Sequence, residues 1–568
     1  MSQCYTPPLY VIHFKGGLNS GEAHRLISYR QCEARFFGRL WSYRCLPFIY
    51  QLNLTELVGS IKHLEEGRNS HYYLVMKRVP SSITPVIAVS RKSSTPLHRQ
   101  IYDSFRDLIV QGNLMSGQQI PSTRTLAEEL GISRFPVLNA YAQLLGEGYF
   151  EGRIGSGTVV SSSLPDQPTL PGPHGGRSTR ILSGPRQPSK ISAQLPGVTS
   201  EPWLQGRAAF VGSQLALDHF PFNLWSQLLA FRCRRIVEAS LHYGHPMGLR
   251  DLREAIVSYL RTARAVRCDA EQIMIVSGSQ QALDITSRVL LDPKDRVWLE
   301  EPGYTLARHI FMMAGSRLVP VPVDQEGLDV AAGRKLCAKA KAVYVCPSHQ
   351  YPLGVVMSAS RRLQLLNWAQ STGAWIIEDD YDSEYRYEGA PIASLQGLDR
   401  YSRVIYIGTF SKVLFPSVRV GYVVIPTDLV DRFVTVRQAM DIFPSNLHQQ
   451  VLSDFINQGH FERHIRRMRP IYHDRLNALV GSLRKDLAGT LKVLASGAGL
   501  HVTVMLKEQA SDEAISRRAA LQHLWLWPLS ICYLGSAPRQ GFILGFGGIP
   551  VDEMPRAVRR LRAALQEK

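Results

Sequence analysis

Hydrophobic and polar positions follow two different patterns along this chain. Between residues 96 and 150, apolar residues recur three or four positions apart, as on one face of a helix. The first of these stretches predicts a helix that starts after Pro96 and ends near Gly112 and Asn113. From about residue 205 onward, short apolar runs alternate with amphipathic segments, which predicts strands and helices in turn.

Two further helices and a hairpin are predicted before residue 160. A short helix from Thr123 to Leu130 is followed by a turn at Gly131 and by a second helix, for which Ser133 is a natural N-cap. The apolar face of this second helix consists of Val137, Ala140, Tyr141, Leu144 and Leu145. The stretch FEGRIGSGTVV then predicts two short strands around glycines. The order is that of a winged helix-turn-helix, although any small helical domain shows similar periodicity.

The region from residue 205 to 568 predicts an α/β domain with a mainly parallel sheet. Its predicted strands are short and apolar along their whole length, as expected where both faces of a sheet are covered. They are QIMIVSG, RVWLEEPG, RLVPVPVD, AVYVCPS, AWIIEDDYD, RVIYIGTFS and RVGYVVIP. Amphipathic stretches such as SRRLQLLNWAQSTG predict the covering helices.

These patterns divide the 568-residue chain into four parts. Residues 1–75 show no sustained period, which leaves two interpretations: a small domain, or an upstream extension of the gene model with translation starting at Met76. We prefer the second. Residues 76–160 form the predicted DNA-binding domain, residues 161–204 a linker rich in Pro, Gly and Ser, and residues 205–568 the α/β domain.

Composition narrows the class of protein and of partner. The formal net charge of +18 favours a polyanionic partner such as nucleic acid, but Lys and Arg are spread along the chain and do not locate the contact. The eight cysteines form no CxxC pair and no His/Cys ligand spacing, which predicts reduced thiols and no metal site. No run of 18 apolar residues predicts a membrane span, and we expect a cytoplasmic protein.

Several short motifs in the α/β domain carry polar residues at the ends of predicted strands. In GTFSKVLFPSVRVGY, Lys412 alone reads equally as a catalyst, a cofactor anchor or a charge at a strand edge. SGSQQALDI opens a helix with free backbone N–H groups that favour a phosphate. IIEDDYDSEYRY gathers carboxylates that are costly to bury without a donor or cation, but it also reads as a solvated acidic turn.

In their order and approximate spacing, these motifs resemble a fold type I pyridoxal 5′-phosphate (PLP) enzyme of the aminotransferase class, over nearly all of residues 205–568. The resemblance implies that Lys412 forms the Schiff base and that Asp379 holds the pyridine nitrogen protonated. It implies further that Tyr381 hydrogen-bonds the ring hydroxyl, with His349 and Gln350 nearby, and that Tyr304 stacks on the ring. The implied phosphate-binding residues are Ser279, Gln280, Thr409, Ser411 and Arg419.

Two other positions bear on what the resemblance implies. Tyr243 looks like the tyrosine that reaches the cofactor phosphate of the other subunit, which implies a homodimer with shared sites. Aminotransferases carry an arginine near the C-terminus that clamps the substrate α-carboxylate with two hydrogen bonds. Here the expected position holds Ile543, and Arg539 lies four residues earlier. Amino-acid transamination is therefore in doubt, whereas PLP binding is not.

Residues 96–160 resemble the winged-helix domain of the GntR family, through IPSTRTLAEELGISR and GYFEGRIGSGT. The predicted DNA-contacting residues are Arg124, Ser133 and Arg134, at helix N-termini where phosphates approach. A GntR-type domain joined to an aminotransferase-like domain resembles the MocR family of bacterial regulators, of the GabR type.

The combined resemblance implies a transcriptional regulator that binds double-stranded operator DNA and is associated with the nucleoid when DNA-bound. A cofactor aldimine at Lys412 would sense an amine, an amino acid or PLP itself. The alternative is a functional class I aminotransferase with an accessory DNA-binding domain. We favour the regulator, which need not be an enzyme, although a residual aminotransferase half-reaction is compatible with its residues.

Overall fold

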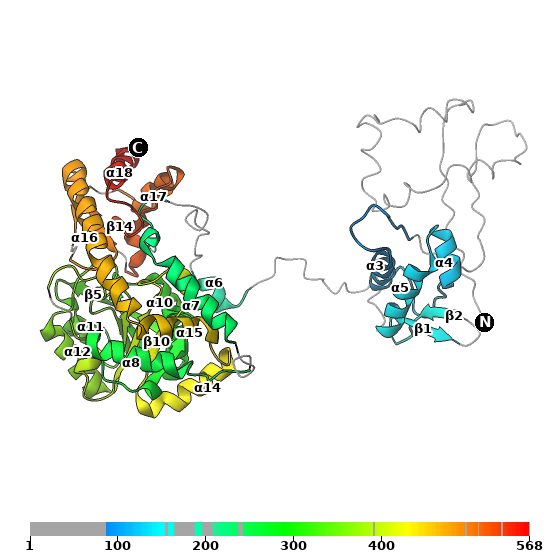
Figure 1. Cartoon of the computed structure of the whole chain (residues 1–568), viewed down its shortest axis with the longest axis horizontal. Helices are drawn as coiled ribbons and strands as arrows, with labels where there is room; N and C mark the ends of the chain where they lie inside the picture. The colour runs from blue at the N-terminus through cyan, green and yellow to red at the C-terminus, as the bar shows by residue number, and fades with distance from the viewer. Residues whose placement is uncertain are drawn as a thin grey trace, which may run out of the picture. The chain divides into compact units, whose positions relative to one another are not determined.

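The computed structural model describes residues 87–153, 157–163, 188–195, 208–212, 214–236, 242–389, 392–494, 497–508, 510–535 and 538–566. The chain divides into two compact units, residues 1–184 and 185–568 (Figure 1). The predictions for residues 1–75 and for most of the linker lie outside the described residues. Where the linker is described, it contains a short helix that was not predicted, α6 (Lys190–Gln194), with the Ser189 hydroxyl accepting from the Ser192 N–H.

The first unit is a winged helix-turn-helix, as predicted. Its helices are α3 (Leu97–Val110), α4 (Thr123–Glu129) and α5 (Arg134–Gly146), followed by antiparallel strands β1 (Phe150–Arg153) and β2 (Gly157–Val160). Ser122 caps α4 by accepting from the Thr125 N–H. Ser133 occupies the N-cap position of α5, but its side chain accepts no capping hydrogen bond.

Aromatic packing holds this unit together. The rings of Phe105, Tyr141 and Phe150 meet edge to face, with centroids 5.2–5.6 Å apart. The predicted apolar face of α5 is buried except at Leu145, which is 42% exposed. At about 100° per residue, a position eight residues after Val137 has turned about 80° away from the buried face. The core is thus formed by the earlier members of the predicted stripe.

The second unit is built on an eight-stranded sheet with the order β3-β10-β9-β8-β7-β4-β5-β6. The strands are β3 (Ile273–Val276), β4 (Arg296–Glu301), β5 (Arg317–Asp324), β6 (Gly327–Leu328), β7 (Ala342–Val345), β8 (Trp375–Asp380), β9 (Val404–Thr409) and β10 (Gly421–Val424). Strands β5, β4, β7, β8 and β9 run parallel to one another, whereas β10 runs antiparallel to both β3 and β9, and β6 runs antiparallel to β5. The prediction of a mainly parallel sheet is confirmed.

Both faces of this sheet are buried, which explains why its strands are apolar throughout. One core includes residues of helices α9 (Ser279–Leu290), α10 (Thr305–Met313) and α14 (Val430–Met440). The opposite core includes residues of α11 (Val330–Leu336), α12 (Ala359–Thr372) and α13 (Leu395–Leu398). The carboxyl ends of β4, β7, β8 and β9 therefore meet at one edge of the sheet, where the predicted site residues lie.

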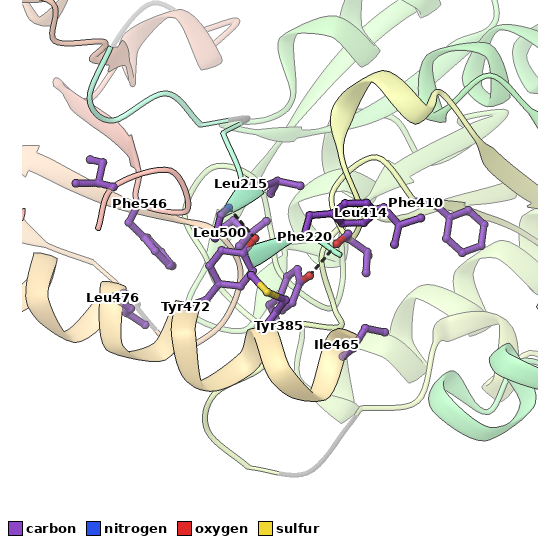
Figure 2. Packing of buried hydrophobic residues seen from close by; sticks show 14 of the residues in the cluster. Leu215, Phe220, Tyr385, Phe410, Leu414, Ile465, Tyr472, Leu476, Leu500 and Phe546 are labelled. Carbon is purple, nitrogen blue, oxygen red and sulfur yellow. Dashed lines mark hydrogen bonds between the residues drawn. The ribbon is translucent and has the colours of Figure 1, made fainter. Parts of the chain in front are cut away.

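A smaller antiparallel sheet near the C-terminus has the order β11-β12-β14-β13. Its strands are β11 (Leu491–Val493), β12 (His501–Leu506), β13 (Trp527–Pro528) and β14 (Gly541–Gly545). Leu476 of helix α16 (His460–Leu487) shares a core with Leu500 and Phe546 (Figure 2). In the same core, Tyr385 donates to the Val413 carbonyl at 3.1 Å, so the loop that carries Lys412 is anchored from within the protein.

The two sheets are linked through helices. Helices α16 and α18 (Met554–Gln566) contact each other, and α17 (Asp512–Leu521) contacts α18. Helix α15 (Asn446–Asn457) contacts α7 (Phe222–Arg234), α8 (Arg250–Arg264) and α16. None of the helices in the described ranges is long and apolar enough to cross a membrane.

Candidate cofactor site

The carboxylates of the acidic stretch at the end of β8 each have their own hydrogen-bond partners. Because successive strand residues point to opposite faces, Glu378 and Asp380 lie on one face and Asp379 on the other. Glu378 accepts from the backbone N–H groups of Leu395 and Gln396 at 2.9 and 3.0 Å. Asp380 accepts from Arg264 at 2.7 Å. The interpretation of this stretch as a solvated turn is wrong, since all three carboxylates are buried.

Like Asp380, Asp379 has a buried carboxylate oxygen without a hydrogen-bond partner among the described residues. Its Oδ2 accepts from the Tyr344 hydroxyl at 2.8 Å, while its buried Oδ1 has no hydrogen-bond partner. Burial raises the pKa of Asp379 to about 7, with the carboxylates of Asp380 and Asp382 adding to the effect and the Tyr344 hydrogen bond opposing it. A protonated pyridine nitrogen would supply the missing donor, so this residue fits the role that the resemblance implied.

Lys412 lies just after β9, in a half-buried position. Its Nζ donates to the backbone carbonyl of Gly212 at 3.5 Å. Burial lowers the pKa of the Lys412 amine, an effect that the Asp382 carboxylate partly opposes. A lysine whose neutral form is favoured is a better nucleophile toward an aldehyde.

Arg419 and the N-terminus of α9, both predicted to bind a phosphate, lie next to each other. Gly278, the N-cap of α9, has φ 111°, and a methyl group at this position would lie 3.2–3.3 Å from the guanidinium of Arg419. The glycine thus leaves room for Arg419 to approach the free N–H groups at the start of α9. A helix N-terminus and a guanidinium together form a strong site for a phosphate dianion.

The remaining residues predicted to bind the phosphate lie at the start of α9 and at or just after the end of β9. Ser279 is the first residue of α9, and Gln280 donates to the Tyr304 hydroxyl at 3.4 Å. Thr409 ends β9, and its hydroxyl accepts from the Ser411 N–H at 3.2 Å. The Ser411 hydroxyl oxygen is buried without a hydrogen-bond partner among the described residues. A phosphate oxygen bound at this site would supply that partner.

An aromatic wall lies beside these groups. The rings of Tyr304 and Tyr351 meet edge to face at 5.5 Å, and those of Tyr351 and Tyr381 at 6.3 Å. Burial raises the pKa of Tyr304, and the charge of Asp379 adds to this effect. An aromatic side chain in this wall suits the predicted stacking on a planar ring, which remains a prediction.

His349 and Tyr381, which were predicted to lie near the ring hydroxyl, are in direct contact. His349 Nδ1 lies 3.0 Å from the Tyr381 hydroxyl oxygen and 3.1 Å from both carboxylate oxygens of Asp382. Gln350 is used differently: its amide nitrogen donates to the carbonyls of Tyr351 and Pro302 at 2.6 and 2.9 Å. It shapes the loop after β7.

The smaller sheet contributes one wall of the site. On β12, His501 and Thr503 share a face, and both side chains donate to the carbonyl of Pro352. Thr503 is paired with Ile543 across the strands, so the Ile543 side chain lies on that same face. The His501 ring lies 5.0 Å from His349 and 5.3 Å from Tyr351. An apolar side chain, 2% exposed, thus stands where the resemblance led us to look for an arginine. Arg539 is exposed.

Tyr243 lies apart from the residues described above. It is 81% exposed and touches Phe443 edge to face, with ring centroids 5.8 Å apart. Such an exposed side chain is compatible with the predicted contact to a second subunit. Its participation there remains a prediction.

The residues that we did not predict are Tyr344, Tyr351, Asp382, His501 and Gly212. Tyr344 belongs to a predicted strand, β7, but its pairing with Asp379 of β8 can be predicted only when the order of the strands in the sheet is known. His501 lies 149 positions from Pro352 and on a different sheet. His349, Asp382 and His501 each carry an atom of a type that can coordinate a metal ion, and these atoms lie within 4.8 Å of one another. The spacing of cysteines and histidines in the sequence gave no indication that these three residues meet.

The predicted DNA-contacting residues lie together on the first unit. Arg134 at the start of α5 donates to the Thr123 hydroxyl at the start of α4, at 3.1 Å. Arg124 is exposed and paired with Glu128 at 3.3 Å. Phe135, the next residue after Arg134, is 70% exposed. The two helix N-termini are thus joined by a side chain that carries a positive charge.

Comparison with known proteins bears on both units. Residues 97–160 match the bacterial regulatory proteins of the gntR family, and residues 234–561 match aminotransferase class I and II. The kynurenine aminotransferase of Pyrococcus horikoshii, solved in complex with PMP, is 28% identical with a TM-score of 0.62, over 66% of this chain and 96% of that chain. LysN, the α-aminoadipate aminotransferase of Thermus thermophilus, is 27% identical with a TM-score of 0.62, over 66% and 97%. The class and its residues here imply PLP.

Two relatives cover both units. The probable rhizopine catabolism regulatory protein MocR of Rhizobium meliloti is 39% identical over 479 residues, 84% of this chain and 96% of that protein. The pyridoxine biosynthesis transcriptional regulator PdxR of Corynebacterium glutamicum is 31% identical over 468 residues, 82% of this chain and 96% of that protein. The chain therefore belongs to the MocR/GabR type of helix-turn-helix transcriptional regulators, in which a GntR-family DNA-binding domain is joined to an aminotransferase-like domain.

Proposed function

We propose that this transcriptional regulator binds PLP at Lys412 and uses the site to sense a small amine, with the result read by its winged helix on operator DNA. The observation that carries the proposal is the buried Asp379 Oδ1, which has no partner within the protein. When bound, PLP supplies an aldehyde with which a primary amine can condense.

The residues around this point divide the work of holding the cofactor. Asp379 receives the ring nitrogen, and Tyr304 covers the ring. Arg419, Ser411 and the N-terminus of α9 bind the phosphate. Lys412, whose pKa burial lowers, provides the amine. Each role rests on a contact or an unsatisfied atom described above.

The apolar wall at Ile543 supports sensing over amino-acid transamination. A substrate carboxylate placed against a buried Ile543 would lose its hydration without gaining a hydrogen bond. The effector that suits this wall is an amine without an α-carboxylate, or PLP itself. Of the relatives, MocR is a probable regulator of rhizopine catabolism and PdxR a regulator of pyridoxine biosynthesis.

The hydrogen bond of Lys412 to Gly212 provides a route by which a change at the cofactor site reaches the chain segment that leads to the DNA-binding domain. Gly212 lies in the segment that follows the linker, residues 208–212. This segment is fixed to the smaller sheet, because the Gly545 N–H donates to the Phe210 carbonyl at 2.9 Å. A change in the bonding of the lysine amine therefore acts at the entry of the chain into the domain. We further propose a homodimer in the cytoplasm in which Tyr243 serves the partner's site.

The experiment is the visible spectrum of the purified protein supplied with PLP, with and without borohydride, followed by mass spectrometry of its peptides. We expect a visible band that borohydride abolishes and a reduced adduct on the peptide containing Lys412. Lys412→Ala should lose both, whereas Lys492→Ala, an exposed position on β11, should keep both. A wild-type protein without a band, or an adduct elsewhere, contradicts the proposal. Sustained multiple-turnover transfer between amino acids and keto acids would favour the aminotransferase alternative.

A further inference from the structure

The hydrogen bonds available to the His349–Asp382 pair and its neighbour Tyr381 cannot all form at the same time. An imidazole Nδ1 has a single in-plane direction, in which it carries either a hydrogen or a lone pair. Three oxygens compete for it: both carboxylate oxygens of Asp382 at 3.1 Å and the Tyr381 hydroxyl at 3.0 Å. Nδ1 therefore cannot donate to Asp382 and accept from Tyr381 at the same time.

The burial of Asp382 decides between the two arrangements. This side chain is 2% exposed, and its carboxylate hydrogen bonds are those to His349. A buried carboxylate facing an unprotonated nitrogen would leave two lone pairs opposed without a proton, at a large cost in free energy. Nδ1 must therefore carry the hydrogen and donate it toward Asp382. The Tyr381 oxygen then can only accept from His349, and its own hydrogen must point elsewhere.

The groups packed around the pair leave one direction in which the hydroxyl hydrogen of Tyr381 can make a useful hydrogen bond. Gly499 packs against it from the smaller sheet so closely that a methyl group there would lie 2.0–2.6 Å from atoms of His349 and Asp382. The His501 ring covers another side at 5.0 Å, and burial lowers the pKa of His501 to about 3, which keeps it neutral. The other ionisable groups near this cluster are the carboxylate of Asp379, the phenol of Tyr351, the thiol of Cys346 and the amine of Lys412.

We propose that Asp382 and His349 are positioning residues that turn the hydroxyl hydrogen of Tyr381 toward the ring oxygen of PLP. This inference rests on the proposed binding of PLP. A hydrogen bond from Tyr381 stabilises negative charge on that oxygen and so favours the deprotonated form of the imine. The pair would thus set the pH at which the site changes charge, by acting through Tyr381.

A matched pair of amide variants tests this. The amide nitrogen of asparagine can take the place of Nδ1, whereas that of glutamine takes the place of Nε2. Both variants are made in the full chain with PLP bound, and the visible absorbance is followed against pH. We expect Tyr381→Phe and His349→Gln to raise the midpoint of the absorbance change by about one pH unit, the effect of losing one hydrogen bond to a charged group. His349→Asn should stay near the wild-type midpoint.

The double variant separates orientation of Tyr381 from a direct effect of His349. In the Tyr381→Phe background, His349→Gln should add no further shift, because there is no hydroxyl left to orient. A shift that persists in that background overturns the proposal, as does a midpoint that His349→Gln leaves unchanged. Because both amides have similar polarity, a general loss of packing would affect Asn and Gln alike and would also overturn it. A wild-type protein with no visible band overturns the proposed function, and this inference with it.

Discussion

The Nζ of Lys412 lies 3.5 Å from the carbonyl oxygen of Gly212, 200 positions earlier in the chain. Gly212 belongs to the short segment that enters the large domain after the linker, and this segment rests on β14. A methyl group at Gly545 of β14 would lie 2.3 Å from the Val211 carbonyl oxygen and 2.6 Å from the Gly212 Cα. The amine that would bind the cofactor and the point where the linker arrives are thus in contact.

Gly545→Ala should uncouple sensing from DNA binding. The added methyl group must displace residues 211 and 212 from β14, and with them the partner of Lys412. We expect the visible PLP band to persist, while an amine effector changes DNA affinity several-fold less than in the wild type. Fluorescence anisotropy on a DNA fragment selected by the wild-type protein measures this. Gly489→Ala is the control, because a methyl group there meets nothing within 4 Å. Wild-type coupling in Gly545→Ala would contradict the suggested route.

The stability of the cofactor-free protein should depend on pH through Asp379. Its pKa is raised from 3.8 to about 7 in the folded state, so the folded state binds the proton more tightly than the unfolded state. The stabilisation from that proton is complete below pH 4 and is lost as pH rises through about 7. Urea unfolding of wild type and Asp379→Asn should therefore differ in pH dependence, by about 2–4 kcal/mol between these limits. Parallel pH profiles of the two proteins would contradict a raised pKa of Asp379.

Ile543→Arg should shift the effector preference toward carboxylates. A guanidinium on the face shared with Thr503 can bind an α-carboxylate with two hydrogen bonds. We expect amino acids to perturb the visible PLP band at about tenfold lower concentration than in the wild type, and amines without a carboxylate to be little affected. Without a ligand, the buried charge should lower stability. Ile543→Leu controls for repacking and should behave as wild type. Equal effects on both ligand classes would show that this wall does not discriminate between them.

Arg134→Ala should weaken DNA binding. Arg134 lies at the N-terminus of the second helix of the helix-turn-helix and bridges to Thr123, so its loss removes both a charge and a tie between α4 and α5. We expect the slope of log K against log salt to fall by about one, as for the loss of one phosphate contact. Arg106→Ala on α3, where Arg106 pairs with Asp103 and Asp107, is the control. An unchanged affinity would remove Arg134 from the DNA-contacting residues.

Much of the architecture could be predicted because its signals are local. The winged helix follows from helical periodicity, a glycine turn and paired strands, and each predicted strand of the large sheet is a strand. Lys412, Asp379 and Ser279 lie at strand or helix ends, where a short motif indicates position as well as residue type. The pairing of β10 antiparallel to β3 and β9 had no such signal, because its apolar pattern suits either direction.

The sequence by itself determined the class of protein and the order of its elements, since these depend on short motifs and local periodicity, and its resemblance to aminotransferases supplied the residues predicted to hold PLP. Tertiary structure alone decided how Asp379, His349 and Lys412 are partnered. Tyr344 and His501 come from other strands and Gly212 from the segment that follows the linker, from 35 to 200 positions away, and hydrogen bonds at about 3 Å depend on how the two sheets pack. Such contacts depend on the packing of the whole core and cannot be predicted from any single stretch of sequence.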